Sequence, residues 1–433
     1  MPYSFLLVSW GSSGNLSPVL TAGRRLRGSG HRVRVMADPM MREEVKGANF
    51  EFIAWNRAPI GAEADPANVS DMKAWFQGAM FDPILAYATD IQDEINRVPT
   101  DAVLSLDFLF GAVLGAEVDG IPIAMLSPHI FIPPLPGAPP VLSSLKPPKT
   151  PEDRAAIAAA AENWTNFWDG FLPSLNSSRA RLGLPGLAHV LDIYDRADRV
   201  LLAIGRAFDF EADSFPDNLR YVGPLLDEPG WAKPWQAPWQ AGSTRPRALI
   251  ACSTGAQGQG DLVQRVVTAT GSVEIEAVVT TGPNLNVADL RAPENVHLLP
   301  SAPHDTVMKE VSLVVTQGGH GTVCRSLLNG LPMLVLPNGR DQNDNALRVE
   351  VKGAGLQLPP TAPEADIAAA MSRLAREPHF REAARRLGDA IRAEIAASSL
   401  VEEMETIAAA GHRRKPIVQD RVQRRSLEEA DNP

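Results

Sequence analysis

The stretch VVTQGGHGTVCRSLLNGLPMLVLPNGRDQNDNALRV, from Val314 to Val349, decides the fold. It opens with a short apolar run typical of a buried strand, turns sharply at the glycines around His320, and continues as a helix from Val323 to Leu328. A second apolar run at Met333 leads into the polar sequence PNGRDQNDN. A strand, a glycine turn, a helix and a strand in this order are typical of a parallel sheet in an α/β domain.

The glycine turn at 317–322 is suited to an anion. A helix that starts after the turn directs backbone N–H groups and the positive end of its dipole toward it. His320 and Thr322 add side-chain donors, so the sequence predicts a diphosphate site. A tight turn that binds nothing has the same pattern, and this alternative stays open.

The polar stretch at 337–345 follows the next predicted strand. It therefore lies at the carboxyl end of a parallel strand, where open α/β sheets bind their ligands. The neighbouring carboxylate and amide of Asp341 and Gln342 suit the hydroxyl groups of a sugar. A plain structural role is compatible with this, because Asp341 or Asn343 could cap the helix that follows.

The pattern of apolar strands and amphipathic helices occurs in both halves of the chain. At 433 residues the chain is too long for one compact core, and two domains are expected. We expect the first strands at 5–10 and 32–37, with a helix at 18–27 between them and a GSSGN loop before it. Further strands at 102–106 and 121–126 flank a small-residue helix at 111–118. In the second half, strands are expected to begin at Ala248, Glu276, Asn295, Ser312 and Met333.

A change of composition marks the domain boundary. The sequence predicts an N-terminal Rossmann-like domain at 1–225, a Pro/Trp-rich linker at 226–246 and a C-terminal Rossmann-like domain at 247–395. A final helix at 396–412 is expected to pack back on the N-terminal domain, and 413–433 is expected to be a polar tail.

Composition excludes several classes of function. The net charge of −10 argues against nucleic acid, which needs clustered Lys and Arg on one face. The two cysteines, Cys252 and Cys324, are expected to be reduced core thiols in a cytoplasmic protein, and the sequence offers no metal site and no apolar window long enough to span a membrane. A homodimer is a further expectation.

The residues described above resemble the nucleotide-sugar signature of family 1 glycosyltransferases, whose bacterial members read close to HGGxGT, LxxGxPxxxxP and DQxxNAxRV. This chain has QGGHGT from Gln317, LNGLP from Leu328 and DQNDNALRV from Asp341. The resemblance implies a GT-B fold, an α/β architecture in which two Rossmann-like parallel-sheet domains face a cleft. It also implies donor-binding roles at these positions: Ser253, Thr254, Ala302, Gln317, Gly319, His320, Gly321, Thr322, Asp341 and Gln342.

The chain departs from the family pattern where the catalytic base is usual. The family commonly has a His three residues before the proline of its first loop, and this chain has Asn15, whose amide cannot accept a proton at neutral pH. Asp107 matches the acid that usually orients that His. Three alternatives follow: Asp107 is the base, His129 is the base, or the acceptor needs no strong base. We favour Asp107, and its plain structural alternative is a cap on the helix near Gly111.

Aromatic residues outside the expected strands are candidates for an apolar acceptor pocket. We name Trp55, Trp75, Phe76 and Phe131 as acceptor-binding residues, within a wider set that includes Phe81, Trp164, Phe167, Trp168 and Phe171. Ordinary core packing is the alternative for each of them.

We therefore expect an inverting, metal-independent glycosyltransferase without a cofactor. It would move a sugar from a nucleoside-diphosphate sugar, UDP-glucose or a dTDP-deoxysugar, to a small lipophilic acceptor such as a natural-product aglycone. One rival is a dinucleotide oxidoreductase, suggested by the glycine-rich first loop and by Asp38 at the end of the second strand. Two others are a non-catalytic sugar-nucleotide-binding partner of another transferase, and a sugar-nucleotide epimerase.

Overall fold

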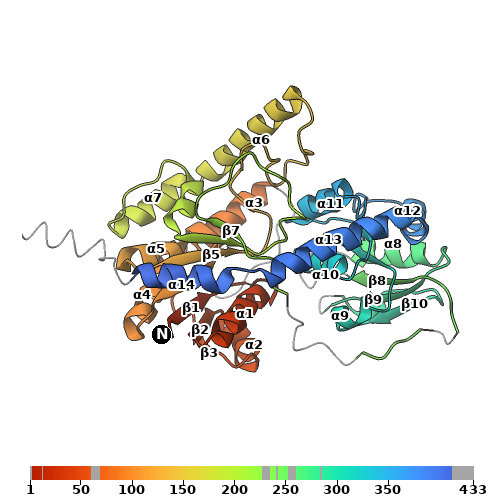
Figure 1. Cartoon of the computed structure of the whole chain (residues 1–433), viewed down its shortest axis with the longest axis horizontal. Coiled ribbons are helices and arrows are strands. Elements are labelled where there is room, and N and C mark those ends of the chain that lie inside the picture. The colour runs from red at the N-terminus through yellow and green to blue at the C-terminus, as the bar shows by residue number, and fades with distance from the viewer. Residues whose placement is uncertain are drawn as a thin grey trace, which may run out of the picture.

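The computed structural model describes residues 2–11, 13–59, 69–226, 235–239, 242–251, 260–282 and 285–411. These residues form two α/β domains that lie side by side (Figure 1). The predicted pair of Rossmann-like parallel-sheet domains is confirmed. Ser253, Thr254, Cys252 and the tail at 413–433 lie outside the described residues.

The N-terminal domain is built on a seven-stranded sheet in the order β3-β2-β1-β4-β5-β6-β7, and every pair in it is parallel. The strands are β1 (Ser4–Val8), β2 (Arg32–Ala37), β3 (Glu51–Ala54), β4 (Ala102–Leu106), β5 (Ile123–Ser127), β6 (Arg199–Leu202) and β7 (Leu219–Tyr221). The helical elements are α1 (Ser13–Gly28), η1 (Pro39–Met41), α2 (Arg42–Gly47), α3 (Val69–Phe76), η2 (Gln77–Phe81), α4 (Ile84–Arg97), α5 (Phe110–Asp119), α6 (Pro151–Asp169), α7 (Leu172–Arg181) and η3 (Val190–Arg196).

The C-terminal domain repeats this plan with a six-stranded parallel sheet in the order β10-β9-β8-β11-β12-β13. Its strands are β8 (Arg247–Ala251), β9 (Glu276–Thr280), β10 (Val296–Leu299), β11 (Leu313–Thr316), β12 (Met333–Val335) and β13 (Gly355–Gln357). Its helical elements are α8 (Gly260–Thr270), η4 (Val287–Asp289), α9 (His304–Val307), α10 (His320–Leu328), α11 (Gln342–Val351), α12 (Glu364–Arg376) and α13 (Pro378–Ala396).

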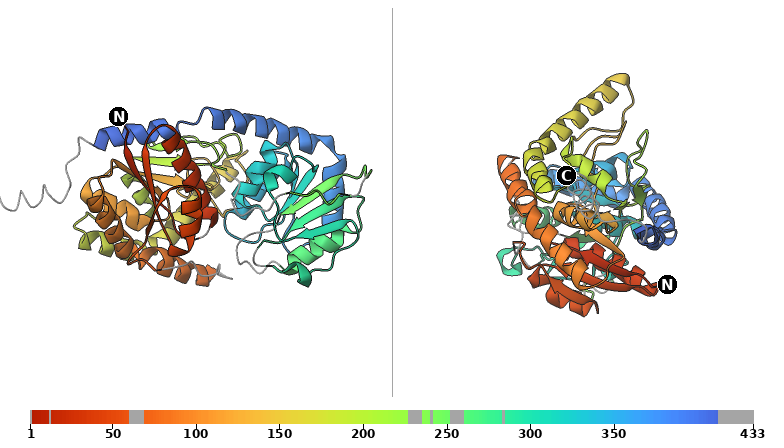
Figure 2. Two further views of the ribbon diagram at one scale, coloured as in Figure 1. Left: turned by 90° about the horizontal axis from the view of Figure 1, so that it is seen from below. Right: turned by 90° about the vertical axis from the view of Figure 1, so that its left-hand side faces the viewer.

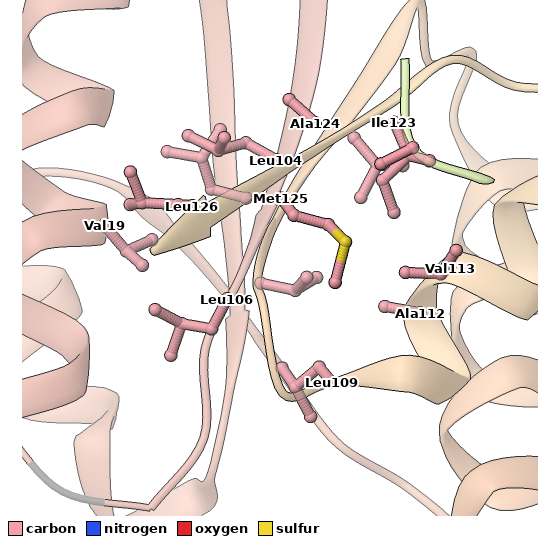
Figure 3. Close-up of a cluster of buried hydrophobic side chains, with 14 of the residues drawn as sticks. Val19, Leu104, Leu106, Leu109, Ala112, Val113, Ile123, Ala124, Met125 and Leu126 are labelled. Atoms are coloured by element: carbon pink, nitrogen blue, oxygen red, sulfur yellow. The ribbon is translucent and has the colours of Figure 1, made fainter. Parts of the chain in front are cut away.

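Both faces of each sheet are covered, which explains the continuous apolar strands. Figure 3 shows Leu104 and Leu106 of β4 beside Met125 and Leu126 of β5, with Val19 of α1 nearby. Ala112 and Val113 of α5 appear in the same cluster. The core therefore fixes the loops that follow β4 and β5, and these loops carry Asp107 and His129.

The last two helices span both domains. α13 packs on α10 of the C-terminal domain, and α14 (Leu400–Gly411) then lies along the N-terminal domain (Figure 2). Leu400, Met404 and Ile407 of α14 are buried in the N-terminal core. The chain thus crosses between the domains twice, and α13 with α14 forms the second crossing.

Two helices begin earlier in the sequence than predicted. α1 begins at Ser13 rather than Pro18, so Asn15 lies inside a helix instead of a loop. α10 begins at His320 rather than Val323. The first N–H groups of a helix have no partner in the helix, so Gly321 in the first turn costs no hydrogen bond and does not mark where α10 begins. Pro18 is the sixth residue of α1 and lies inside the helix, so it does not mark the start of α1 either.

Candidate active site

Asp107, His129 and the glycine turn lie at one junction because both sheets have the same winding. In each sheet the strand order reverses between the first strand and its neighbour, β1 with β4 and β8 with β11, and ligands bind outside the carboxyl ends of the strands at such a point. Asp107 directly follows β4, His129 follows β5, and Gln317 to Thr322 follow β11.

Asp107 and His129, considered separately from the sequence, form a pair. His129 Nε2 lies 3.1 Å from Asp107 Oδ1, and the Tyr194 hydroxyl donates to Asp107 Oδ2 over 3.2 Å. The Asp107 side chain is 1% exposed and that of His129 is 18% exposed. Asp107 does not cap α5, because the N-cap position is Leu109 and no side chain caps it. Of the two, only His129 has surface to offer to a substrate.

His129 is held in its charged form. Its burial opposes protonation, but the attraction of the Asp107 carboxylate, the hydrogen bond to it and the hydrogen bond to the Ile130 carbonyl outweigh this and raise the pKa of His129 to about 9. Its Nδ1 lies 2.9 Å from the Ile130 oxygen, so both ring nitrogens face oxygen acceptors. The Asp341 carboxylate of the other domain also favours the imidazolium.

The Asn15 side chain is hydrogen-bonded to the loop that precedes it. Its side-chain amide donates to the Trp10 carbonyl over 3.2 Å and so ties the start of α1 to the end of β1. Asp38, which suggested a ribose-binding acid, is 2% exposed and accepts a 2.6 Å hydrogen bond from the Gly11 amide. Burial raises the pKa of Asp38. Its carboxylate supports the first loop from inside, so the feature that favoured a dinucleotide enzyme has a structural explanation.

The glycine turn has the geometry that an anion site requires. Gly318 has φ +97, and a Cβ there would lie 2.7 Å from Val335 Cγ1, so a side chain is excluded both by backbone conformation and by space. Gly319 is the N-cap residue of α10, and His320, Gly321 and Thr322 form its first turn. Desolvation lowers the pKa of His320 to about 4, so its ring is neutral.

The polar stretch after β12 is braced against the glycine turn. Asn345 of α11 donates from Nδ2 to the Gly318 carbonyl and to Asp341 Oδ2, both over 2.9 Å. Asp341 is half-buried and occupies the N-cap position without capping the helix. Gln342 is 3% exposed, and its Oε1 accepts from the Asn338 amide over 2.7 Å. Asp341 is thus the more accessible of the two predicted sugar contacts. Ala302 is 8% exposed, in the loop after β10.

Aromatic side chains continue from His129 into the N-terminal domain. The Phe108 ring stacks on the His129 ring with centroids 5.1 Å apart, and Trp168 stacks on Phe108 at 6.1 Å. Phe76 contacts Trp168 and Trp75, and Trp75 lies 6.3 Å from Trp10. Trp75, Phe76 and Phe108 are only partly buried, so they offer an apolar surface beside His129.

The other two predicted acceptor residues are buried. Trp55 is 3% exposed, packs edge-on against Tyr87 and donates its indole N–H to the Ser9 carbonyl over 3.0 Å, so it belongs to the core. Phe131 is 5% exposed and packs against Tyr194, and both line a pocket of about 370 Å³ in the N-terminal domain. We therefore exclude Trp55 from the acceptor surface.

Two contacts across the junction were missed by sequence reasoning. The Leu142 amide of the N-terminal domain donates to both oxygens of Asp344 of α11, over 3.0 and 3.1 Å. Arg348 of the same helix pairs with Asp209 at 2.8 Å and is buried. No local pattern marks these residues as partners, since they lie more than a hundred residues apart in the sequence.

Within the described residues, no three His, Cys, Asp or Glu side chains gather as a metal site would require. Cys324 is a buried free thiol against His320, with 3.3 Å between Sγ and Nε2. Within the same part of the chain, no helix is both long and apolar enough to cross a lipid bilayer.

Comparison with known proteins agrees with the site. Residues 264–407 match the family model for the erythromycin biosynthesis protein CIII-like C-terminal domain. The 4'-demethylrebeccamycin synthase of Lentzea aerocolonigenes is 25% identical over 418 residues, covering 92% of this chain and 98% of that protein.

Solved structures show the same fold. The kitacinnamycin glycosyltransferase superposes with a TM-score of 0.74 at 22% identity, over 93% of this chain and 99% of that one. The glycosyltransferase VinC, solved in complex with dTDP, has a TM-score of 0.66 at 15% identity, over 95% of this chain and 100% of that one. The protein is a glycosyltransferase with the GT-B fold. More particularly, residues 264–407 of its C-terminal domain are similar to the CIII-like family model, and most of the chain is similar to the 4'-demethylrebeccamycin synthase.

Proposed function

We propose that the protein transfers a sugar from a nucleoside diphosphate to an acidic hydroxyl group of a lipophilic natural-product aglycone, with inversion and without a metal ion. The observation that carries this proposal is the Asp107–His129 pair, which lies opposite Asp341 and the start of α10. Its relatives are named for transfer to natural products, which supports the acceptor class.

The donor would lie on the C-terminal domain. Its diphosphate would meet the first N–H groups of α10, with Gln317 and Thr322 beside it, and Asp341 would accept from sugar hydroxyls. Ser253 and Thr254 stay candidates for further phosphate contacts, and Ala302 for a backbone contact to the base. Both UDP and dTDP fit this proposal, and VinC binds dTDP.

The acceptor proton would pass to His129. In the structure both ring nitrogens face oxygen atoms, so the acceptor oxygen must replace the Ile130 carbonyl at Nδ1. The productive complex holds one proton fewer than the free imidazolium enzyme with a neutral acceptor. In that complex either His129 is neutral and the acceptor keeps its hydroxyl proton, or His129 is an imidazolium and the acceptor is ionised. These two forms hold the same number of protons, so their populations depend on pH in the same way. Asp107 orients the ring and stabilises its charge.

The bond changes then follow in one in-line step. The acceptor oxygen forms a bond to the anomeric carbon while the bond from that carbon to the diphosphate oxygen breaks. The electron pair leaves with the diphosphate, and the backbone N–H groups at the start of α10 stabilise its charge. The acceptor proton remains on His129. A single displacement inverts the configuration at the anomeric carbon.

The test is release of nucleoside diphosphate from UDP- and dTDP-sugars with a panel of phenolic and aliphatic acceptors, with and without EDTA. We expect acceptor-dependent release that EDTA leaves unchanged, and a product whose anomeric proton coupling shows the inverted configuration. Retained configuration, or activity lost in EDTA and restored by a divalent ion, would contradict the mechanism. Nucleotide binding without transfer to any acceptor would favour a non-catalytic partner.

A further inference from the structure

The segment between His129 and α6 has an unusual composition. It reads IPPLPGAPPVLSSLKPPK from Ile132 to Lys149 and contains seven prolines. Each proline fixes φ and removes a backbone N–H, so this segment, called the strap below, is stiff and cannot join a sheet. Because the strap is stiff, its position depends on the few points where other groups hold it.

The strap is held within the N-terminal domain at three points. At its start, the Trp164 indole donates to the Ile132 carbonyl over 2.8 Å. In its middle, the Asp213 amide donates to the Pro136 carbonyl over 2.8 Å. At its end, the Lys149 amide donates to the Asp153 carboxylate over 2.8 Å. Next to Leu142, the Val141 side chain is buried in the N-terminal core, but these three hydrogen bonds do not include the Leu142 amide.

The Leu142 amide is bonded to the other domain. The Leu142 amide donates to the Asp344 carboxylate, which is 5% exposed on α11, the helix that begins one residue after Asp341. Leu142 has φ +61 and Ser144 has φ +56, a left-handed conformation that is unfavourable for residues with a Cβ. The Leu142 side chain is nevertheless 43% exposed. An apolar side chain is thus displayed at the domain junction by a strained turn.

Burying a carboxylate costs desolvation free energy, so the use of one to hold a single backbone amide indicates that the position of that amide matters. Burial raises the pKa of Asp344 to about 6, against the opposing effect of Arg348. Asp341 and Asp209 repel the Asp344 charge, and Arg348 is committed to Asp209 at 2.8 Å. The arrangement is therefore not an ion pair that stabilises the domain contact by itself.

We propose that Asp344 is a positioning residue for the acceptor: from the donor helix α11 it holds Leu142 of the strap in place as part of the acceptor site. The inference rests on the proposed function, since it assigns the acceptor to the N-terminal side of the junction. Its consequence is that the acceptor site is complete only when the two domains are together. A displaced strap would leave the donor site intact and open the acceptor side to water.

The test separates acceptor from donor effects. In Asp344→Ala the acceptor KM should rise by about 5- to 10-fold, the worth of one hydrogen bond, with the donor KM and the affinity for the free nucleotide unchanged. Hydrolysis of the donor should rise relative to transfer. Asp344→Asn keeps an oxygen that accepts from the Leu142 amide, so it should restore the acceptor KM. Leu142→Gly tolerates the backbone conformation and should raise the acceptor KM through loss of the side chain alone.

The matched control is Arg154→Ala, which removes an exposed 2.9 Å contact to Asp213 near the middle of the strap without crossing the junction. Its acceptor KM should stay at the wild-type value. If Asp344→Ala fails to fold, Asp344→Glu, which keeps the carboxylate but shifts the strap, should raise the acceptor KM alone. An unchanged acceptor KM, or an equal loss for donor and acceptor, would overturn the inference. Failure of the wild-type protein to transfer any sugar would instead overturn the proposed function.

Discussion

Single residues connect the parts of the donor site. Asn345 is fully buried, and its amide joins the Gly318 carbonyl to the Asp341 carboxylate. Gly318 in the proposed anion turn and Asp341, the proposed sugar contact, therefore share one support. A donor that binds correctly at its diphosphate meets a carboxylate already in place, which reduces the entropy lost on binding.

This support leads to a prediction that separates Asp341 from Gln342. Asp341→Ala should weaken binding of the nucleotide sugar by about 0.5 to 1.5 kcal/mol, since the sugar contact is lost. Binding of the free nucleotide should not change. Gln342→Ala should weaken both ligands, because Gln342 holds the Asn338 amide and with it the loop. Calorimetry with each ligand measures the two affinities. If Asp341→Ala, like Gln342→Ala, weakens binding of both ligands by the same amount, Asp341 has no separate contact with the sugar.

The sequence indicated which residues are candidates for the site better than it indicated which residues contact them. Gln317, His320, Thr322 and Asp341 could be proposed from the sequence because they lie in one continuous stretch beside glycines. Asn345 could have been found too, since four residues after Asp341 is one helical turn. Tyr194 carries no such signal, because only the folded chain brings its hydroxyl to Asp107.

At the scale of elements, α13 fixes α10, the helix that we propose binds the diphosphate. Gly388 of α13 lies so close to α10 that a Cβ there would lie 2.0 Å from the Leu327 carbonyl oxygen. Backbone atoms cannot give way cheaply, so the two helices are in direct contact at this point. The orientation of α10 therefore depends on a helix that carries no site residue.

Gly388→Ala should consequently lower the free energy of unfolding by about 1 to 3 kcal/mol. The control is Gly28→Ala near the end of α1, where no heavy atom lies within 4 Å of the added methyl group and the gain in helix propensity should stabilise by about 0.5 to 1 kcal/mol. Urea denaturation measures both variants. Similar stabilities for both variants would mean that α13 and α10 adapt without cost.

The elements were largely predictable from periodicity. β2 and β4 have the predicted bounds and β9 begins at the predicted residue, because their apolar runs are bounded by polar residues or turns. β3 was not predicted, since all four of its residues remain partly or fully exposed and its run is not continuously apolar. β7 and β13, three residues each at or near a sheet edge, are too short to show a period.

At the scale of the whole molecule, the first crossing between the domains is attached to the C-terminal domain. Trp235 and Trp239 donate their indole N–H groups to the two oxygens of Glu310, over 2.8 and 2.6 Å, and Arg247 lies 5.1 Å above the Trp239 ring. The Pro/Trp-rich composition suggested a linker, but the described part of it is packed against the C-terminal core. Long-range partners such as Glu310 are not visible in the sequence.

Glu310→Gln replaces the carboxylate with an amide, whose single oxygen can accept from only one of the two indole groups. We expect the free energy of unfolding to fall by about 1 kcal/mol. This is at the lower end of the range for a lost hydrogen-bond acceptor, because the tryptophans are only partly buried and water can replace the lost oxygen. Glu274→Gln is the control, since its 3.0 Å contact with Arg245 is exposed and should contribute little. Equal stability of the two variants would show that the indole contacts add nothing.

The central claim is that the Asp107–His129 pair takes the acceptor proton, and the pH dependence of kcat/KM tests it most directly. Because the pKa of His129 is about 9, kcat/KM for an acceptor of higher pKa should rise about tenfold per pH unit below 9 and then level. Asp107→Asn removes the charge that raises this pKa, so its rise should end at a lower pH.

His129→Gln removes the proton acceptor, so it should lose about 10²-fold or more of kcat/KM and the rise itself. Asn15→Ala should keep the wild-type profile, because the Asn15 amide is committed to the Trp10 carbonyl. Measured together, the four profiles give one answer. The predicted result is a rise that ends near pH 9 in wild type and at a lower pH in Asp107→Asn, and that is absent in His129→Gln. The same profile in all of them would contradict the claim.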